Sequence, residues 1–355
     1  MSHFTVLVIG ENPEKQLAPY HEFECTGEDN EYIQDIDITE ERRKEYEEDT
    51  SQRLRGPDGA LHEFFDSKGS WRTEFSQPDP DASKWDVGRR KKFVPPGYEE
   101  VTVPTKEVES FARYIEGWSG QKMVPFGEQP DLAGEHKYGY VIVDQAGNVV
   151  KAIDRTNPNK KWDWWVLGGR WTGFFTLKPG RRGTTGKPGL MTDPASAGKA
   201  DAALWCDIDF TAMRDEAERK ARERYRKFFQ LLGEHTFPQT FEVMRKAHPD
   251  SIEAARTAYW AQPGIEAVKK DDEFSWDLDP AEFSVTEDQH AEKARERAIS
   301  TFAVVKDGKW FEKGSMGWWG CVHDEKDQDQ WNREFAKLLD SVGSETLLSV
   351  YDCHI

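Results

Sequence analysis

The sequence has few cysteines and no long apolar run. Its cysteines include no Cys-x-x-Cys pair, so no disulfide framework is indicated; they are Cys25, Cys206, Cys321 and Cys353. No stretch of about 18 apolar residues is present, which argues against a membrane-spanning helix. The first residues also lack the basic region and cleavage site of a secretory signal peptide. We therefore expect a cytoplasmic protein without a membrane partner.

The familiar catalytic motifs are also missing. The chain contains no Gly-x-Ser-x-Gly, no His-Glu-x-x-His, no Gly-Lys-Ser/Thr loop and no zinc-finger spacing. No reaction can be named from such a sequence, so whether the protein is an enzyme stays open. We expect neither a cofactor nor a tightly held metal ion.

Basic side chains are scarce relative to acidic ones. Lysine and arginine number 48 against 66 aspartates and glutamates, which gives a net charge of −18. Such a charge repels phosphate backbones, so we expect no direct binding to nucleic acid. The acids are densest in residues 22–49, where 13 of them accompany three basic residues. A solvated surface explains this segment, and a docking surface for a basic partner is the alternative.

Short apolar runs, turn residues and amphipathic stretches alternate along the chain, which predicts the α+β class with antiparallel or mixed sheets. Residues 4–9 and 347–354 are apolar and rich in β-branched or aromatic side chains, so we predict that these two ends pair in one sheet. Helices are expected at 39–49, 107–118, 210–232, 237–261 with a break near Pro249, and 330–340; hairpins at 138–153 and 300–312; and a further strand at 162–167.

The length of 355 residues exceeds one ordinary core. We expect an N-terminal α+β unit at 1–200, a mainly helical segment at 201–298, and a hairpin–helix–strand unit at 299–355 that completes the sheet. Residues of about 51–100 and 178–200 are rich in turn-forming types and are expected to be irregular insertions.

Tryptophan is frequent and clustered, with the main groups at Trp162, Trp164, Trp165, Trp171, Trp318 and Trp319. Indole rings most often fill cores, so we predict that Trp164 and at least one of Trp318 and Trp319 are mostly buried. The alternative is an aromatic pocket or an interface anchor.

Two groups of residues carry chemistry that a site needs. Gly168-Gly169-Arg170 follows the strand expected at 162–167, where paired glycines allow close approach of a ligand and an arginine binds phosphate or carboxylate. With Trp164, Trp171, Trp318 and Trp319 these residues form a candidate ligand-binding set. A strand end whose arginine pairs with an acid is the structural explanation.

The second group lies at the two chain ends. If the terminal strands are antiparallel neighbours, His3 faces Asp352, Cys353 and His354. Histidine and cysteine bind zinc or form nucleophile–base pairs. Successive strand residues point to opposite faces, so Cys353 does not share a face with both of its neighbours. Ordinary strand-end polar residues and a buried cysteine are the plainer explanation.

Several segments resemble one group of phage and prophage proteins. They are the opening MSHFTVLVIG, WDWWVLGGRW at 162–171, GWWG at 317–320 and the final DCHI. These matches extend over nearly the whole chain. The resemblance implies a phage origin and a role inside the infected cell, and it carries over no catalytic residue.

Two functions stay open. One is a binding protein that engages a host or defence component through an acidic or tryptophan-rich face, as in host takeover or counter-defence. The other is an enzyme or sensor for a small phosphorylated or nucleotide ligand, with Arg170 in a tryptophan-lined pocket. An isolated concave pocket that contains Arg170 with other polar groups would favour the second, and a flat, acidic, patch-bearing surface with buried tryptophans would favour the first.

Overall fold

The computed structural model describes residues 2–65, 69–81, 88–119, 121–275 and 278–355, apart from the side chains of Trp118, Ser119 and Trp318. The chain forms two compact units: unit 1 (Met1–His21 and Lys161–Ile355) and unit 2 (Glu22–Lys160). Unit 1 joins both ends of the chain, and unit 2 is one continuous insertion. The boundaries therefore lie at positions other than the residues 200 and 298 expected from the sequence.

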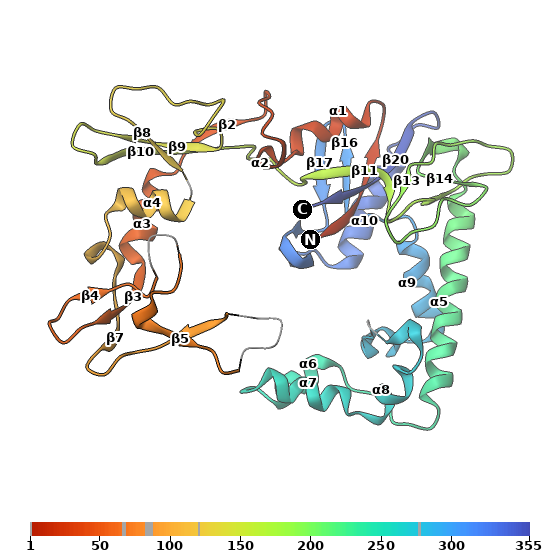
Figure 1. Ribbon diagram of the computed structural model, residues 1–355. Coiled ribbons are helices and arrows are strands. Elements are labelled where there is room, and N and C mark those ends of the chain that lie inside the picture. Colours follow the sequence, from red (N-terminus) through yellow and green to blue (C-terminus); the bar gives the residue numbers. More distant parts are fainter. Residues whose placement is uncertain (1, 66–68, 82–87, 120, 276–277) are drawn as a thin grey trace. The chain divides into compact units, whose positions relative to one another are not determined.

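Unit 1 contains a mixed sheet with the strand order β13–β11–β20–β1–β16–β17, and β15 pairs with β20 beside this path (Figure 1). The central strands β1 (His3–Ile9) and β20 (Leu347–His354) are antiparallel, with His3 opposite His354. The predicted α+β class and the predicted pairing of the chain ends are thus confirmed. The other strands are β11 (Trp164–Gly169), β13 (Lys187–Pro188), β15 (Ala202–Leu204), β16 (Ala303–Lys306) and β17 (Lys309–Glu312).

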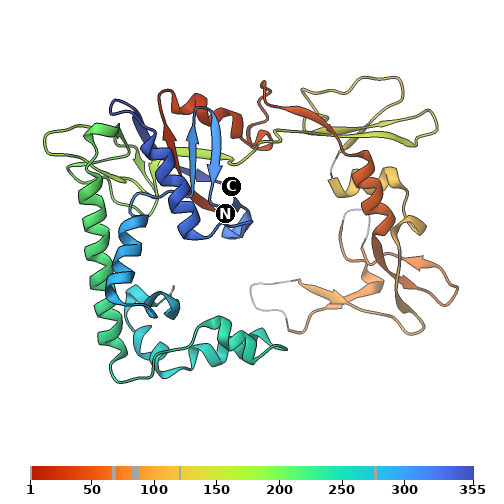
Figure 2. The same ribbon diagram turned by 180° about the vertical axis from the view of Figure 1, so that it is seen from behind.

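Side-chain alternation along β1 separates two cores. Leu7 and Ile9 pack under α10 (Gln328–Asp340) and the start of α5 (Phe210–Leu232), on the sheet face that α10 covers (Figure 2). Phe4, Val6 and Val8 join the other core, which α1 (Pro13–Leu17) covers with Leu17. Residues opposite one another in a ladder share a face. His3, Asp352 and His354 therefore lie on the Leu7 face, beyond the end of that core.

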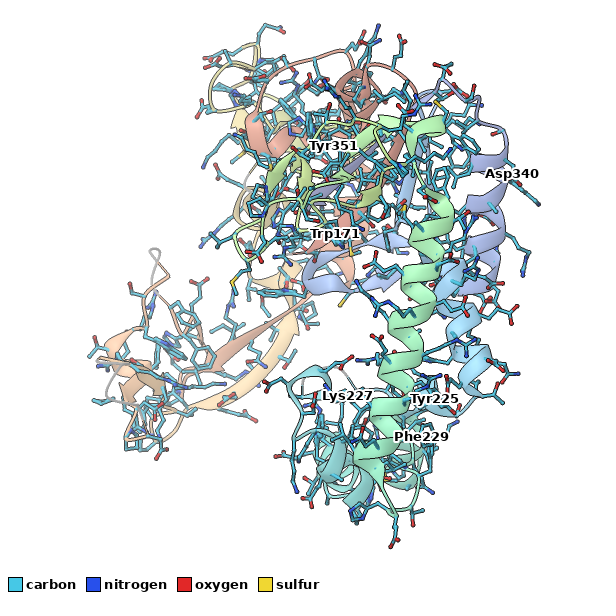
Figure 3. All side chains as sticks on the ribbon, turned by 90° about the vertical axis from the view of Figure 1, so that its right-hand side faces the viewer. Trp171, Tyr225, Lys227, Phe229, Asp340 and Tyr351 are labelled. Carbon is cyan, nitrogen blue, oxygen red and sulfur yellow. The ribbon has the colours of Figure 1, made fainter. Side chains whose placement is uncertain are left out.

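Helix α5 leads from the sheet into a helical arm, with Tyr225, Lys227 and Phe229 near its far end (Figure 3). Its bounds equal the predicted ones, and Asp209 caps it by accepting the Ala212 N–H. The arm contains α6 (Phe241–Ala247), α7 (Ile252–Trp260), α8 (Pro263–Val268) and α9 (Glu287–Arg297) around a core that includes Phe228 and Phe274. Pro249 lies between α6 and α7, which confirms the predicted break.

Unit 2 has a sheet of order β2–β10–β9–β8, against which α3 (Thr39–Glu48) and α4 (Phe111–Ser119) pack. These strands are β2 (Gln34–Asp37), β8 (Lys122–Val124), β9 (Gly139–Val143) and β10 (Val149–Thr156). A second part contains β3 (Thr50–Arg55), β4 (Leu61–His62), β5 (Ser76–Pro78), β6 (Arg90–Lys92) and β7 (Glu99–Pro104).

Two expected irregular segments contain strands instead. Residues 51–100 form the β3–β7 and β5–β6 ladders, because Leu54, Phe64 and Phe75 supply a small core. Residues 178–200 include β13 and β14 (Lys199–Ala200), which pairs with β12 (Phe175–Thr176). The remaining elements are α2 (Phe23–Thr26), β18 (Ser315–Met316), β19 (Val322–His323) and 3-10 helices at Ala18–Tyr20, Thr73–Phe75, Thr105–Glu107, Trp205–Asp207, Asp272–Phe274, Pro280–Phe283 and Trp318–Gly320. No helix in the described ranges is both long and apolar enough to span a membrane.

Candidate functional site

Two histidines meet where the chain ends pair. His3 begins β1 and His354 ends β20, and their ring centroids lie 4.9 Å apart in an edge-to-face arrangement. Their side chains are 12% and 7% exposed, respectively. The predicted strand register is what brings these rings together at the end of the sheet.

Each ring is held by its own carboxylate. His3 Nδ1 lies 2.8 Å from Oδ1 of Asp352, and His354 Nδ1 lies 2.7 and 2.8 Å from the two carboxylate oxygens of Asp163. An ionised carboxylate only accepts hydrogen bonds, so each Nδ1 carries the hydrogen and donates it. Neither Nε2 has a hydrogen-bond partner among the residues described, so both rings have Nε2 left for a ligand.

The Gly168–Gly169 turn is built around two buried carboxylates. The φ angles of these glycines are +79° and +55°, in the left-handed region that favours glycine. A Cβ on Gly169 would lie 2.3 Å from Cβ of Asp352, and one on Gly168 would lie 2.5 Å from Oδ2 of Asp201. The protein itself therefore fills the space that the glycines leave. The Arg170 N–H donates to Asp352 Oδ2 at 3.0 Å, so this turn fixes the carboxylate that holds His3.

Asp201 supports the turn from the other side, and sequence reasoning missed it. It is 0% exposed and accepts hydrogen bonds from Thr172 Oγ1 (3.0 Å), the Gly173 N–H (2.5 Å) and the Gly186 N–H (2.7 Å). One carboxylate thus ties the turn after β11 to the segment that leads into β13. The available signal was a single aspartate inside the apolar run Ala200–Leu204.

Asp163 was missed as well. It precedes β11, and its N–H donates to the His354 carbonyl at 2.9 Å, which places its carboxylate beside the His354 ring. Its side chain is 19% exposed. The only signal for Asp163 in the sequence is an acid between two tryptophans at the start of a strand, because its partner is 191 positions away.

Trp164 lies against the histidine pair. Its ring stacks on His354 with a centroid distance of 5.1 Å and an interplanar angle of 14°, and it meets His3 edge-to-face at 5.3 Å. It is 42% exposed, so the prediction that Trp164 is mostly buried is wrong. Trp164 lies opposite His354 in the ladder, on the Leu7 face beyond the covered core. Trp171 follows Arg170 in the turn and is half-buried.

A tryptophan loop is tied to the residue before His3. The Ser2 hydroxyl donates to the Gly317 carbonyl (2.9 Å) and accepts from the Gly320 N–H (2.7 Å). Trp319, inside this clamped loop, has φ +62° and is 80% exposed. The expectation that one of the two loop tryptophans is buried does not hold for Trp319, and the Trp318 side chain lies outside the described residues.

Cys353 does not join the polar cluster. It points to the opposite sheet face and packs in the core with Phe4 and Tyr351. Complete burial, with the nearby Asp352 and Asp163 carboxylates, raises the pKa of its thiol well above the usual value. The thiol therefore stays protonated and behaves as a core side chain, not as a nucleophile.

The cluster that remains is His3, His354, Asp352, Asp163, Trp164 and the turn that carries Arg170. Within the described part of the chain, no group of three or more histidine, cysteine or acidic side chains is placed to hold a metal ion. The two site carboxylates bind the Nδ1 atoms, and Asp352 also accepts a backbone N–H. This arrangement is suited to moving protons at two Nε2 atoms.

Comparison of the chain with models of protein families, with curated proteins and with solved structures finds no match.

Proposed function

We propose that the protein is an acid–base enzyme that binds a small phosphorylated molecule at His3, His354 and Arg170. The observation that carries this proposal is the pair of adjacent imidazoles, each held at Nδ1 by a separate carboxylate. Orienting a histidine through Nδ1 fixes its tautomer and directs Nε2 to the substrate. Two such rings side by side provide a proton acceptor and a proton donor for the same reacting group.

Arg170 provides the matching positive charge. Its backbone is anchored by Asp352, whereas its side chain is exposed and its guanidinium has no hydrogen-bond or ion-pair partner among the described residues. A guanidinium binds two oxygens of a phosphate group through parallel N–H bonds. The Arg170 N–H and the His3 ring bind the two oxygens of the same Asp352 carboxylate, so the backbone that carries Arg170 lies beside the residue that orients His3.

The test is to incubate the protein with a library of phosphate monoesters and diesters and to measure their turnover by phosphorus NMR. We expect His3→Gln and His354→Gln each to lower kcat by about 10²–10⁴-fold, because glutamine is polar but does not carry protons at neutral pH. His235→Gln is the matched control, since His235 is an exposed histidine of the helical arm. The proposal fails if no ester is turned over, or if turnover survives both site substitutions in folded protein.

A second candidate is binding to a host or defence protein with a basic surface, in the cytoplasm of an infected cell. The supporting observation is that Glu40, Glu41 and Glu48 of α3 are exposed and have no ion-pair partner within the described ranges. Exposed acids of one sign speed association with a basic surface, and salt weakens the effect.

The binding candidate is tested by affinity purification from infected cells with wild-type protein and the triple variant Glu40→Gln, Glu41→Gln, Glu48→Gln. One captured protein that salt releases and that the triple variant fails to retain would support it. Equal capture by both proteins would contradict it.

A further inference from the structure

One segment of unit 1 departs from the acidic character of the chain. Residues 178–188 contain four cations and no acid, although the whole chain has a net charge of −18. All four side chains, Lys178, Arg181, Arg182 and Lys187, are exposed. The segment therefore produces a local positive field that the net charge conceals.

This basic segment is fixed beside the candidate site. Its last two residues, Lys187–Pro188, pair in parallel with Gly168–Gly169. The Gly189 N–H donates to the Gly169 carbonyl at 2.8 Å, and the Gly186 N–H donates to the buried Asp201 at 2.7 Å. Lys187 consequently lies opposite the turn that presents Arg170.

Three cations on the turn after β11 and on the basic segment have no partner among the described residues. Arg181 pairs with Asp207 at 3.3 Å, and Lys178 donates to the Cys206 carbonyl at 2.7 Å. Arg170, Arg182 and Lys187 have no hydrogen-bond or ion-pair partner among the described residues. One guanidinium is enough to bind a single phosphate bidentately. Three cations without a partner on the turn after β11 and on the basic segment therefore fit a ligand that carries more than one phosphate.

One exposed indole lies against the histidines, and a second lies on a loop that is tied to Ser2. Trp164 is 42% exposed and contacts both histidine rings. Trp319 is 80% exposed, and its loop is clamped by the hydroxyl of Ser2, the residue before His3. An exposed indole beside cations is a typical platform for a nucleobase, and stacking contributes about 1–3 kcal/mol per base.

From these observations we infer that the substrate is a short, single-stranded oligoribonucleotide. The inference rests on the proposed acid–base function and names its substrate class. The cations bind successive phosphates and the exposed indoles stack on bases. The net charge predicted no nucleic-acid binding, but a short ligand senses the local field within about a Debye length of 8–10 Å.

The ribose 2′-hydroxyl supplies the nucleophile for cleavage, so no further reactant is needed. One histidine Nε2 removes the 2′-hydroxyl proton, and the oxygen attacks the adjacent phosphorus to form a 2′,3′-cyclic phosphate. The bond from phosphorus to O5′ breaks, and the other histidine gives its proton to O5′. The histidines exchange protonation states during the step, and solvent restores them afterwards.

The experiment compares three substrates by chromatography with mass detection: the triribonucleotide ApApA, its all-deoxy analogue, and AMP as a monoester. We expect cleavage of ApApA to a 2′,3′-cyclic phosphate product and no cleavage of the deoxy analogue. His3→Gln and His354→Gln should abolish the reaction through kcat.

Cation variants separate binding from chemistry. Arg182→Gln with Lys187→Gln should raise KM about tenfold with kcat little changed, and should reduce the salt dependence of log(kcat/KM) by roughly 0.7 for each lost phosphate contact. The control pair is Lys293→Gln with Arg333→Gln, two exposed cations on α9 and α10.

The outcomes distinguish this inference from the proposed function. Histidine-dependent cleavage of the deoxy analogue, or histidine-dependent turnover of AMP but not of ApApA, overturns the oligoribonucleotide inference and leaves the acid–base function standing. An unchanged KM in the double cation variant also overturns it. No histidine-dependent turnover of any phosphate ester overturns both.

Discussion

The candidate site of unit 1 and the β10 strand of unit 2 use charged side chains in opposite ways. In unit 2 opposite charges meet directly: Arg155 pairs with Asp29 and Asp35 at 2.8 and 3.0 Å, and Lys160 pairs with Glu24 at 2.8 Å. At the site of unit 1 the carboxylates bind imidazole rings and backbone N–H groups instead. The first pattern neutralises charge within the fold. The second holds proton-carrying groups in place and leaves their outward atoms for a ligand.

The carboxylates of the two regions also differ in burial. The carboxylates that meet Arg155 are 60% and 45% exposed, so water screens these pairs. Asp201 and Asp352 are 0% and 1% exposed, and each depends on the donors that the turn supplies. A carboxylate in that position is stable only with those hydrogen bonds, so the unit 1 site should be much less tolerant of substitution than the unit 2 surface.

The largest expected effect comes from Asp201→Ala. It leaves the Gly173 and Gly186 N–H groups and the Thr172 hydroxyl without their acceptor, and should lower the free energy of unfolding by about 3–5 kcal/mol. Denaturant titration measures this. Asp193→Ala, an exposed aspartate of the same segment, is the control and should change stability by less than about 0.5 kcal/mol. Equal losses of stability in the two variants would contradict the expectation that the buried carboxylate tolerates substitution less well.

Arg155→Met tests unit 2 and should cost less, about 1–3 kcal/mol. Methionine keeps much of the apolar stem, but the hydrogen bonds to Asp29, Asp35 and the Lys137 carbonyl are lost. Hydrogen exchange of the β9 and β10 amides reports the local change. Arg113→Met, at a side chain 67% exposed, is the control. If Arg155→Met lost more unfolding free energy than Asp201→Ala, the expected order of the two regions would be wrong.

Trp164→Ala should lower stability by only about 1 kcal/mol, because the ring is 42% exposed. Trp331→Ala is the matched contrast: this ring is 1% exposed and donates from Nε1 to the Thr301 carbonyl at 2.8 Å, so its loss should cost about 3–5 kcal/mol. Thermal melts of both variants decide whether Trp164 is a site residue or a core residue. Similar melting temperatures would assign it to the core.

The smallest expected effect is the pH dependence of Asp154→Asn in unit 2. Burial, with the nearby Glu24 carboxylate, raises the pKa of Asp154 above its usual 3.8. The protonated form is favoured in the folded state, so its stabilising contribution is present below pH 3.8 and is lost as the pH rises through the folded pKa. The variant should therefore melt higher than wild type at neutral pH, with a difference that shrinks toward pH 3.8. A constant difference would contradict this assignment.

Sequence patterns predicted correctly those helices and strands whose ends are marked by neighbouring residues. Helix α5 was placed correctly because Asp209, the apolar stripe and Gly233 mark its two ends in the sequence itself. Residues 51–100 were misread because their strands are short and rich in turn-forming residues, and only long-range pairing of β3 with β7 stabilises them. The strand predicted at 162–167 is observed as β11 at Trp164–Gly169, and it pairs with β20 in unit 1.

Some residues of the candidate site were indicated by the sequence, and others were found only in the structure. The sequence indicated His3 and His354 through the apolar ends of the chain, and Arg170 through its paired glycines. It did not indicate that these two groups form one site, which follows from β20 lying between β1 and β11. Asp163 and Asp201 were not identified, because a single acid has no local pattern that separates a buried acceptor from a solvated charge.

By itself, the sequence determined the α+β class, the pairing of the terminal strands, the long helix α5 and the excess of negative charge. These properties follow from side-chain periodicity, capping residues and composition, which neighbouring residues set. Only the tertiary structure decided which carboxylate holds which histidine, which tryptophans stay exposed, and that Lys187 lies opposite the turn that carries Arg170. Those outcomes depend on register and burial across strands far apart in the chain, and hydrogen bonds and desolvation act on distance in space and not along the sequence.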